Sequence, residues 1–354
     1  MKVGLITFHD TTNFGSLLQT YGLYRAIEKC GVECEVIDYQ CESIVERELP
    51  GKIRFTLNPL CFAKQLWNRY LMVKKYNKMS HFLKHNMQLG AKCNRKTVTG
   101  IDGVYDKYVV GSDIVWGMDI TNADTAYFLD FVSDKNRKFA YSSSVGNPWT
   151  SDEKNLLRPM LQDFNAIAVR EIESADWVEE LTSKRPDVVC DPTMLLSGAE
   201  WSAFKSDKYK NRNYVFVYFN DSEGRCLDMA KRYAKQRDLE VCYVNYWGPI
   251  DGVHSVRPYS LEDFLSLIFY AKRVFTASYH GMLFSTYFEK NFVFFNRAHK
   301  SRMRTLAQRL NVEYCDGERV DVNDLPDVDY SSVNKALAEY RKYSMSRLEQ
   351  MLRL

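Results

Sequence analysis

The sequence lacks several features that would assign a class of function directly. Its charges are nearly balanced, with 48 Lys and Arg against 45 Asp and Glu, so no basic excess indicates nucleic-acid binding. Its nine cysteines form no Cys-x-x-Cys pair and are odd in number, which argues against a disulfide framework and a zinc site. No apolar run approaches the roughly 18 residues needed to cross a membrane. We therefore expect neither a metal nor a nucleic acid among its ligands.

The sequence also lacks a histidine cluster at metal-ligand spacing and a recognisable signal peptide. Only His81 and His85, of six histidines, stand four residues apart, and their Lys-rich surroundings are typical of a solvated helix surface. A strand begins at Val3 without a basic segment or cleavage site, so we expect a cytoplasmic protein without a signal peptide. The 354 residues and 45% apolar content fit two domains better than one.

Short apolar runs alternate with helical patterns along most of the chain. Residues 3–8 predict a strand, residues 17–27 carry an apolar helical face, and residues 35–38 predict a second strand. This βαβ opening indicates a parallel sheet in an α/β fold. Composition turns polar near 196–212, which marks a domain boundary. We predict α/β domains at 1–196 and 197–330 and a bracing helix at 331–354.

Residues 41–100 interrupt the alternation and predict a helical insertion in the first domain. Within 52–78, aromatic and aliphatic residues stand among lysines and arginines, a pattern that suits contact with an anionic membrane surface or cover over a lipid-linked substrate. The competing interpretation is a helix that packs its apolar face on the sheet. The pattern is compatible with both interpretations.

Polar or charged groups follow several of the predicted strands. Because the carboxyl ends of parallel strands meet at one edge of a sheet, we expect these groups to gather where doubly wound folds bind ligands. The groups are Asn13–Gln19, Gly111–Asp113, Ser142–Ser144, Arg170–Glu171 and Asp191–Thr193. Neither a Gly-x-Gly-x-x-Gly fingerprint nor a phosphate-binding P-loop occurs among them.

The segment 273–288 predicts a strand, a tight turn and a helix. Backbone N–H groups at the start of such a helix form an anion site. His280 can carry a proton at neutral pH, and Gly281 would let a ligand approach the backbone. The alternative is a buried histidine that caps a helix in an ordinary α/β unit.

Six motifs together resemble the polysaccharide pyruvyl transferase family. They are Asn13-Phe-Gly-Ser-Leu-Leu-Gln19, Val109-Val-Gly-Ser-Asp-Ile-Val-Trp116, Tyr141-Ser-Ser-Ser-Val-Gly146, Val169-Arg-Glu171, Asp191-Pro-Thr193 and Ser278-Tyr-His-Gly281. The resemblance implies two Rossmann-like domains facing across a cleft, similar to the glycosyltransferase B architecture. The insertion at 41–100 and the last fifty residues carry no matching motif.

The resemblance also implies an activity. Phosphoenolpyruvate, as co-substrate, would donate its three-carbon unit to two hydroxyls of a glycan sugar and form a cyclic pyruvate ketal. This transferase would serve surface polysaccharide biosynthesis, such as exopolysaccharide or capsule, without another cofactor. Its acceptor would be a lipid-linked or nucleotide-linked glycan, reached from the cytoplasm or at the inner face of the cell membrane.

The resemblance and the chemistry assign roles to individual residues. We predict His280 as acid/base, with Arg170 and Asp113 as further catalytic groups. Donor binding is assigned to Arg170, Ser278, Tyr279, His280, Gly281, Arg297 and Arg302. Acceptor binding is assigned to Asn13, Ser16, Gln19, Ser112, Asp113 and Trp116. No residue is assigned to metal binding.

Each assignment has an alternative in the structure of the chain. The resemblance implies an Arg for donor binding at the position where this chain has Ser278. Either Arg297, Arg302 or Arg304 would take the place of that Arg, or the Ser278 hydroxyl and the helix N-terminus would be sufficient to bind the donor. Asp113 equally suits a turn or a helix cap. Arg170 equally suits a salt bridge with Glu171 or Glu173.

Two rival functions remain open at this stage. One is a glycosyltransferase or epimerase that uses a nucleotide sugar, because a helix N-terminus can hold a diphosphate as well. The other is a catalytically silent scaffold of a polysaccharide assembly complex, for which Ser278 is the only hint.

Overall fold

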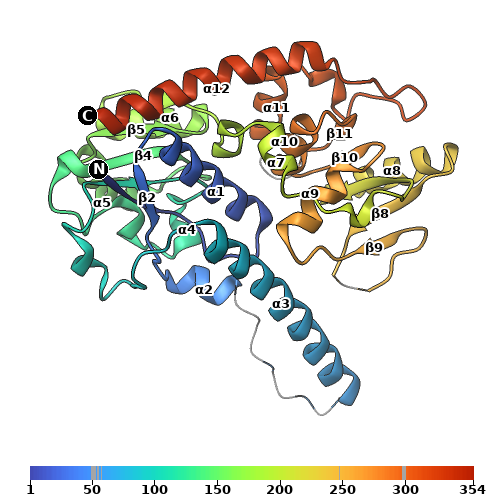
Figure 1. Cartoon of the computed structure of the whole chain (residues 1–354), viewed down its shortest axis with the longest axis horizontal. Coiled ribbons are helices and arrows are strands. Elements are labelled where there is room, and N and C mark those ends of the chain that lie inside the picture. The colour runs from blue at the N-terminus through green and yellow to red at the C-terminus, as the bar shows by residue number, and fades with distance from the viewer. Residues whose placement is uncertain (49–52, 54–55, 57, 247, 297–299) are drawn as a thin grey trace. The chain divides into compact units, whose positions relative to one another are not determined.

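In the computed structural model (Figure 1), the chain divides into two compact units. Unit 1 comprises Met1–Leu196 and Tyr340–Leu354, and unit 2 comprises Ser197–Glu339. The structure describes residues 1–48, 53, 56, 58–246, 248–296 and 300–354, without the side chains of 300–302. Each unit contains one sheet in which every pairing between strands is parallel. The predicted fold class, two α/β domains with parallel sheets, is confirmed.

The sheet of unit 1 has six strands in the order β2-β1-β3-β4-β5-β6. The strands are β1 Lys2–Ile6, β2 Glu33–Val36, β3 Lys107–Val110, β4 Lys138–Ser143, β5 Ala166–Val169 and β6 Asp187–Val188. The central strands β3 and β4 are buried at every residue, as expected when helices cover both faces of a parallel sheet. The residue types at 187–190 predict a strand that extends to Cys190, but β6 ends at Val188, and the Cys190 N–H donates instead to the Ser344 hydroxyl at 2.9 Å.

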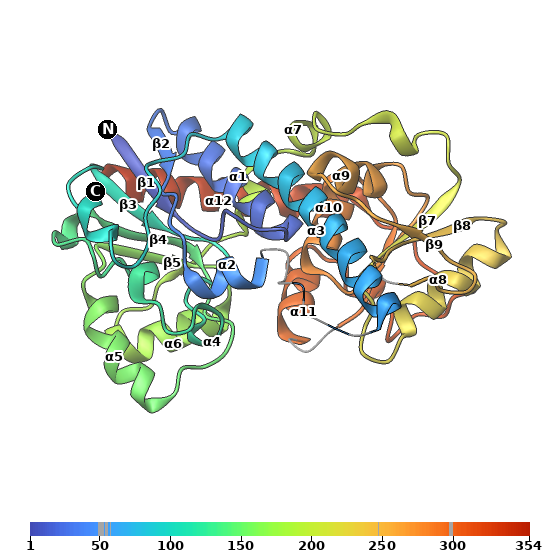
Figure 2. The same ribbon diagram turned by 90° about the horizontal axis from the view of Figure 1, so that it is seen from below.

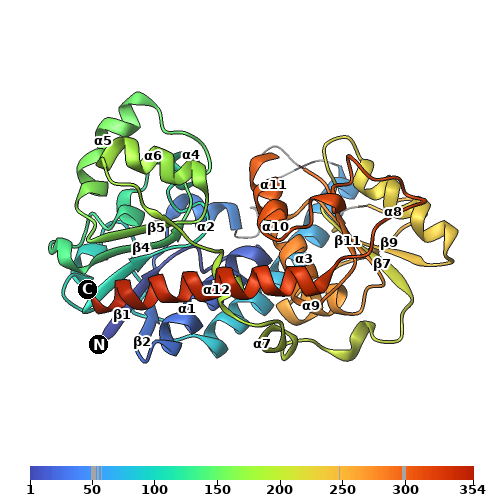
Figure 3. The ribbon, with the colours of Figure 1, turned by 90° about the horizontal axis from the view of Figure 1, so that it is seen from above.

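Helices cover both faces of this sheet (Figures 2 and 3). The helix α1 (Phe14–Lys29) and the C-terminal half of α12 (Tyr330–Arg353) lie on one side, and α5 (Ser151–Gln162) and α6 (Ile172–Thr182) lie on the other. Thr150 and Glu153, three residues apart, predict a capping box at the start of α5, and the two residues do exchange hydrogen bonds there. The short helix α4 (Met118–Thr121) follows β3.

The insertion contains α2 (Glu42–Glu48) and the 28-residue helix α3 (Pro59–Asn86). The C-terminal half of α3 packs on α1, where the rings of Phe82 and Tyr21 meet edge to face at 5.6 Å. The N-terminal half extends away from the rest of unit 1 (Figure 1). The packing interpretation therefore holds for the second half, and its partner is α1. Of the predicted range 52–78, residues 52, 54–55 and 57 lie outside the described residues.

The sheet of unit 2 has five strands in the order β11-β10-β7-β8-β9. The strands are β7 Tyr214–Tyr218, β8 Glu240–Val244, β9 His254–Val256, β10 Val274–Thr276 and β11 Phe292–Phe294. The helices are α7 Gly198–Ser202, α8 Arg225–Gln236, α9 Leu261–Phe269, α10 Tyr279–Tyr287 and α11 Lys300–Arg309. From Pro249 to Pro258 the residue types predict a loop, whereas the structure has β9 there, because a three-residue edge strand is too short to show a period.

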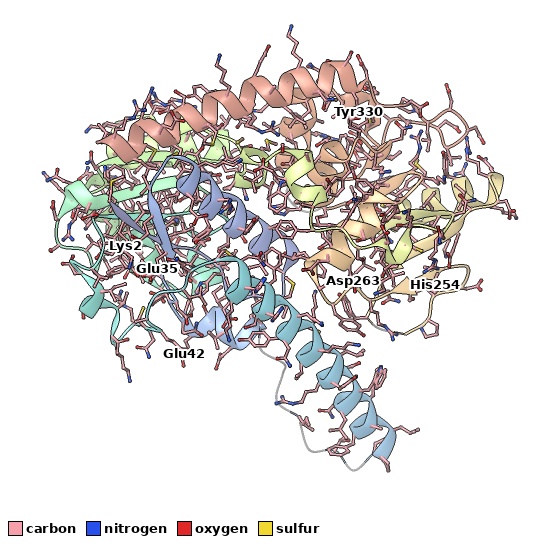
Figure 4. All side chains as sticks on the ribbon, viewed as in Figure 1. Lys2, Glu35, Glu42, His254, Asp263 and Tyr330 are labelled. Atoms are coloured by element: carbon pink, nitrogen blue, oxygen red, sulfur yellow. The ribbon has the colours of Figure 1, made fainter. Side chains whose placement is uncertain are left out.

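The helix α12 has 24 residues, the length the sequence predicts. Its first residue, Tyr330, is labelled in Figure 4 and donates to the carbonyl oxygens of Ser285 and Lys290, both in unit 2. From Tyr340 onward the helix belongs to unit 1. That this helix braces the two domains stays a prediction. Among the described residues, no helix is both long and apolar enough to span a bilayer.

Candidate functional site

The loop after β3 in unit 1 requires glycine at its first position. Gly111 has a φ of 152°, and a Cβ atom there would lie 1.9 Å from the carbonyl oxygen of Tyr141 on β4. The loop is tied to β4 again at the Ser144 N–H, which donates to the Asp113 carbonyl at 3.0 Å. This close approach fixes Ser112 and Asp113 at the carboxyl edge of the sheet.

Asp113 and Ser16 come together although they are far apart in sequence. The Ser16 hydroxyl, near the start of α1, donates to Asp113 Oδ2 at 2.5 Å. Asp113 Oδ1 accepts from the N–H of Ile114 at 2.9 Å, so the carboxylate also shapes the turn. Asn13 is exposed and caps α1 by accepting from the Gly15 N–H. The edge thus brings together three of the predicted acceptor residues, Asn13, Ser16 and Asp113, the last of which is a carboxylate.

Arg170 is held by carboxylates inside unit 1. Its Nε donates to Glu171 at 2.7 Å and its Nη1 donates to Asp191 at 3.2 Å. The side chains of Arg170 and Asp191 are 3% and 0% exposed, so the pair is desolvated. Gln19 Oε1 accepts from the same Nη1 at 3.4 Å. This geometry supports the salt-bridge interpretation of Arg170 over a direct grip on a charged donor.

Three buried polar atoms at this edge have no hydrogen-bond partner within the described part of the chain. They are Gln19 Nε2, Ser112 Oγ and Ser144 Oγ. Buried polar groups are normally satisfied, by protein, by ordered water or by a ligand. The orphaned atoms belong to α1 and to the ends of β3 and β4, so they mark one edge of one sheet as polar and receptive.

Trp116 is not available to stack on a sugar. The side chain is fully buried, its ring stacks on Phe128 at 5.6 Å, and its indole N–H donates to the Tyr127 carbonyl at 2.9 Å. The acceptor role predicted for Trp116 is therefore replaced by core packing. The sequence could not show this, because a core tryptophan and a ligand-stacking tryptophan read alike.

In unit 2 the turn from β10 to α10 has the predicted form. Ser278 is the N-cap of α10, and its hydroxyl oxygen accepts from the Gly281 N–H at 3.3 Å. The Ser278 N–H donates to Thr276 Oγ1, which itself donates to the Tyr218 carbonyl on β7. The start of the helix, with its positive dipole end, is thereby fixed to the carboxyl edge of the sheet.

Gly281 has a packing role at this turn. A Cβ atom at Gly281 would lie 2.2 Å from Thr276 Oγ1 and 3.2 Å from the Tyr218 ring. The missing side chain lets α10 pack closely on β10 and β7, so the space is filled by protein and not by a ligand. The packing explains why glycine stands at this position, and the assignment of Gly281 to donor binding stays a prediction.

His280 and Asn296 are the polar side chains of greatest interest at this edge. His280 is half-buried in the first turn of α10, edge-on to the ring of Tyr279. Asn296 follows β11, is 4% exposed, and has no hydrogen-bond partner for either amide atom among the described residues. A buried amide left in this state points to a ligand or ordered water.

The strand register places Asn296 beside the start of α10. Thr276 pairs with Phe294, and the Phe295 N–H donates to the Thr276 carbonyl, so Asn296 falls level with Ser278. Asn296 is the second residue after β11, and the register thus brings its backbone close to the start of α10. We missed Asn296 in the sequence, although its place directly after an apolar run was the available signal.

The predicted arginine substitutes receive limited support. Arg297 lies outside the described residues, and only the backbone of Arg302 is described, within α11. Arg304 Nη2 donates to Glu318 at 3.1 Å. Within the described residues, no cluster of three His, Cys, Asp or Glu side chains could hold a metal ion.

Solved structures of similar fold are distant from this chain. A putative UDP-N-acetylglucosamine 2-epimerase from Listeria monocytogenes has 12% identity and a TM-score of 0.49, with 97% of this chain and 96% of that chain covered. The glycosyltransferase SsfS6 from Streptomyces sp. SF2575 has 11% identity and a TM-score of 0.42, with 100% of both chains covered. Similarity at this level carries no inference about ligand or reaction.

The sequence itself gives the decisive comparison. No curated protein matches it. The model of one family, described as polysaccharide pyruvyl transferase, matches residues 13–299. That range covers most of the chain and includes the loops at the carboxyl edges of both sheets. The chain therefore belongs to the polysaccharide pyruvyl transferase family.

Proposed function

We propose that this protein transfers the pyruvate unit of phosphoenolpyruvate to two hydroxyls of a glycan sugar, forming a cyclic pyruvate ketal. Family membership supports a pyruvyl transfer in polysaccharide biosynthesis. The single observation that carries the proposal is the edge of the second sheet. There the capped start of α10 and the half-buried His280 occur with the buried amide of Asn296, which has no hydrogen-bond partner among the described residues.

The donor's chemistry fits these groups. Phosphoenolpyruvate carries a phosphate and a carboxylate, which oriented N–H donors and the positive end of a helix dipole stabilise. The Asn296 amide offers a further N–H donor that protein does not already use within the described residues. In this proposal Ser278 caps the helix and orients its N–H groups, and so the arginine expected at its position is not needed there.

The reaction breaks the carbon–carbon π bond of the donor and its carbon–oxygen bond to phosphate, and forms a C–H bond at the methylene carbon and two bonds from C2 to sugar oxygens. A proton adds to the methylene carbon of the donor, a sugar hydroxyl oxygen bonds to C2, phosphate leaves, and the second hydroxyl oxygen takes its place. The two hydroxyls release two protons, one of which balances the proton gained by carbon while the other leaves with phosphate. His280 is assigned to move the proton at the donor, because an imidazole can serve as both general acid and general base.

The acceptor is assigned to unit 1. Asp113 accepts a proton or hydrogen bond from a sugar hydroxyl, and Gln19, Ser112 and Ser144 contribute the orphaned polar atoms of that edge. Arg170 acts by holding Gln19 and Asp191 in place. In this proposal the acceptor is a glycan that becomes part of a surface polysaccharide.

The test begins with the stability of the purified chain in millimolar phosphoenolpyruvate. A ligand that binds only the folded protein raises stability by about 2.7 kcal/mol at a hundred times its dissociation constant. Wild type should shift, Asn296→Leu should shift far less, and His280→Gln should shift without releasing phosphate in the presence of an acceptor. Asn323→Leu, an exposed asparagine in the same unit, serves as the matched control.

Two outcomes would contradict the proposal. One is stabilisation by a UDP-sugar and indifference to phosphoenolpyruvate, which would indicate a nucleotide-sugar enzyme. The other is phosphate release by His280→Gln at the wild-type rate, which would remove the assigned acid/base. Arg170→Ala is a poor probe of donor binding, because it leaves the buried Asp191 carboxylate without its cation.

A further inference from the structure

The N-terminal half of α3 exposes large apolar side chains that nothing in the described chain covers. Leu60 is 81% exposed and Trp67 is 54% exposed. Phe62, Leu66 and Tyr70 are exposed as well. Figure 4 shows side chains of this half projecting outward from the helix. A soluble surface seldom groups so many large apolar residues, so the group marks an interaction surface.

These residues form one face of the helix. At 3.6 residues per turn, Leu60, Phe62, Leu66, Trp67 and Tyr70 fall within an arc of about 160°. Lys64 borders one side of this arc and Arg69 borders the other. The opposite side carries Cys61, Gln65 and Asn68. An apolar arc with aromatic residues and basic borders is the pattern of a helix lying in a membrane interface.

The charge of α3 identifies the partner. The 28 residues of the helix include six Lys or Arg and no Asp or Glu. Lys and Arg beside the apolar arc can place their stems on the apolar layer and their charges at anionic head groups. A second copy of this helix would bring six like charges against six, which opposes self-association. The chemistry therefore favours an anionic lipid surface over another copy of the chain.

We propose that Pro59–Tyr70 of α3 docks this protein on a membrane surface that contains anionic lipids. The same helix also contacts the loop before α1, next to the residues assigned to the acceptor. Its Tyr76 hydroxyl donates to Asp10 Oδ2 at 3.0 Å, and its Lys75 lies over the ring of Phe14 at 4.2 Å. Resting on the proposed function, this contact favours a lipid-linked acceptor, because the docked helix holds the loop before α1 near the lipid.

The experiment measures binding of the whole chain to vesicles of phosphatidylcholine, with and without phosphatidylglycerol, in the absence of donor. We expect binding to the anionic vesicles that weakens with salt. The double variant Leu66→Ser and Trp67→Ser should bind the vesicles at least about tenfold more weakly, because each substitution removes an apolar side chain that would be buried in the lipid. Lys64→Gln with Arg69→Gln should lose about fivefold for each charge.

Matched controls come from exposed residues elsewhere in the chain. Val104→Ser with Leu156→Ser removes two other exposed apolar side chains, and Lys335→Gln with Lys342→Gln removes two other exposed charges. Both should bind vesicles as wild type does. Quenching of tryptophan fluorescence by brominated lipid should fall in Trp67→Phe, because Trp116 and Trp201 are buried.

Three results would overturn the docking proposal: no binding of wild type to anionic vesicles, equal losses in the controls, or self-association that the α3 variants abolish without any lipid binding. The acceptor is tested separately, with the glycan either on a lipid in the vesicles or free in solution. The Leu66 and Trp67 double variant should lose phosphate release only with the lipid-linked glycan. If wild type releases no phosphate with either glycan while vesicle binding persists, the proposed function fails and the docking surface stands.

Discussion

Replacing Lys75 with methionine should stabilise unit 1 at neutral pH. Lys75 is 9% exposed and lies over the Phe14 ring, 4.2 Å from its centroid. Burial lowers the pKa of Lys75 from 10.5 to about 8, against the attraction of Glu48. Because the pKa is lower in the folded state, folding carries the full cost of the buried charge below about pH 8. That cost disappears as the pH rises from about 8 to 10.5, where the native state loses its proton first.

The expected magnitude follows from this shift. A lowering of about 2.5 pH units corresponds to about 3 kcal/mol, from which the lost attraction to the Phe14 ring removes about 1 kcal/mol. Lys75→Met should therefore be about 2 kcal/mol more stable than wild type at pH 7. The advantage should shrink toward zero, or reverse slightly, near pH 10.5.

The measurement is urea unfolding of both proteins at the two pH values, with hydrogen exchange used to identify the transition that contains α3. Lys78→Met, at an exposed position of the same helix, should change stability by no more than about 0.5 kcal/mol. If Lys75→Met is less stable than wild type at pH 7, and the difference is the same at pH 10.5, the buried charge is fully compensated and our reasoning is refuted.

Three further substitutions test the geometry of the two sheet edges. Gly111→Ala should lower the free energy of unfolding, measured by chemical denaturation, by at least about 3 kcal/mol, because its Cβ would lie 1.9 Å from a backbone oxygen. The control Gly100→Ala, whose Cβ would have nothing within 4 Å, should be nearly neutral. Equal effects of the two substitutions would contradict the assigned backbone contact. Gly281→Ala should lose about 1–3 kcal/mol of stability through overpacking against Thr276, and unchanged stability would mean that the helix start is looser than described. Asp191→Ala should cost about 3 kcal/mol or more in thermal unfolding because it removes one partner of a buried ion pair, and a neutral result would show that Glu171 alone neutralises Arg170.

Much of the fold could be predicted because periodicity and caps are local signals. The strands predicted at 3–8 and 35–38, the capping box at Thr150 and the final helix need only neighbouring residues, and all are present, although the strand bounds differ by one or two residues. The register of β9, a short edge strand, depends on β8 and could not be predicted locally. The end of β6 depends on Ser344, more than 150 residues away in the chain.

The candidate site was predictable in position but less so in role. Polar groups after strands did gather at sheet edges, as for Ser16 and Asp113. Burial decides whether such a group serves a ligand or the core, and burial is set by distant packing. Trp116 and Gly281 show this, since one is sealed by Phe128 and the other by Thr276. Asn296, like Ser278, is a polar residue that follows a strand. It was not predicted as a site residue because the interpretation of this segment relied on the basic residues that follow it.

The division of α12 between the units bears on how the chain folds during synthesis. Unit 2 is complete at Glu339, while unit 1 still lacks Tyr340–Leu354. Until that segment emerges, the Tyr141 hydroxyl and the Cys190 N–H lack Ser344, their native partner. Unit 1, although it begins first, thus finishes after unit 2. A released chain truncated after Glu339 should hold a folded second unit and an unfinished first one.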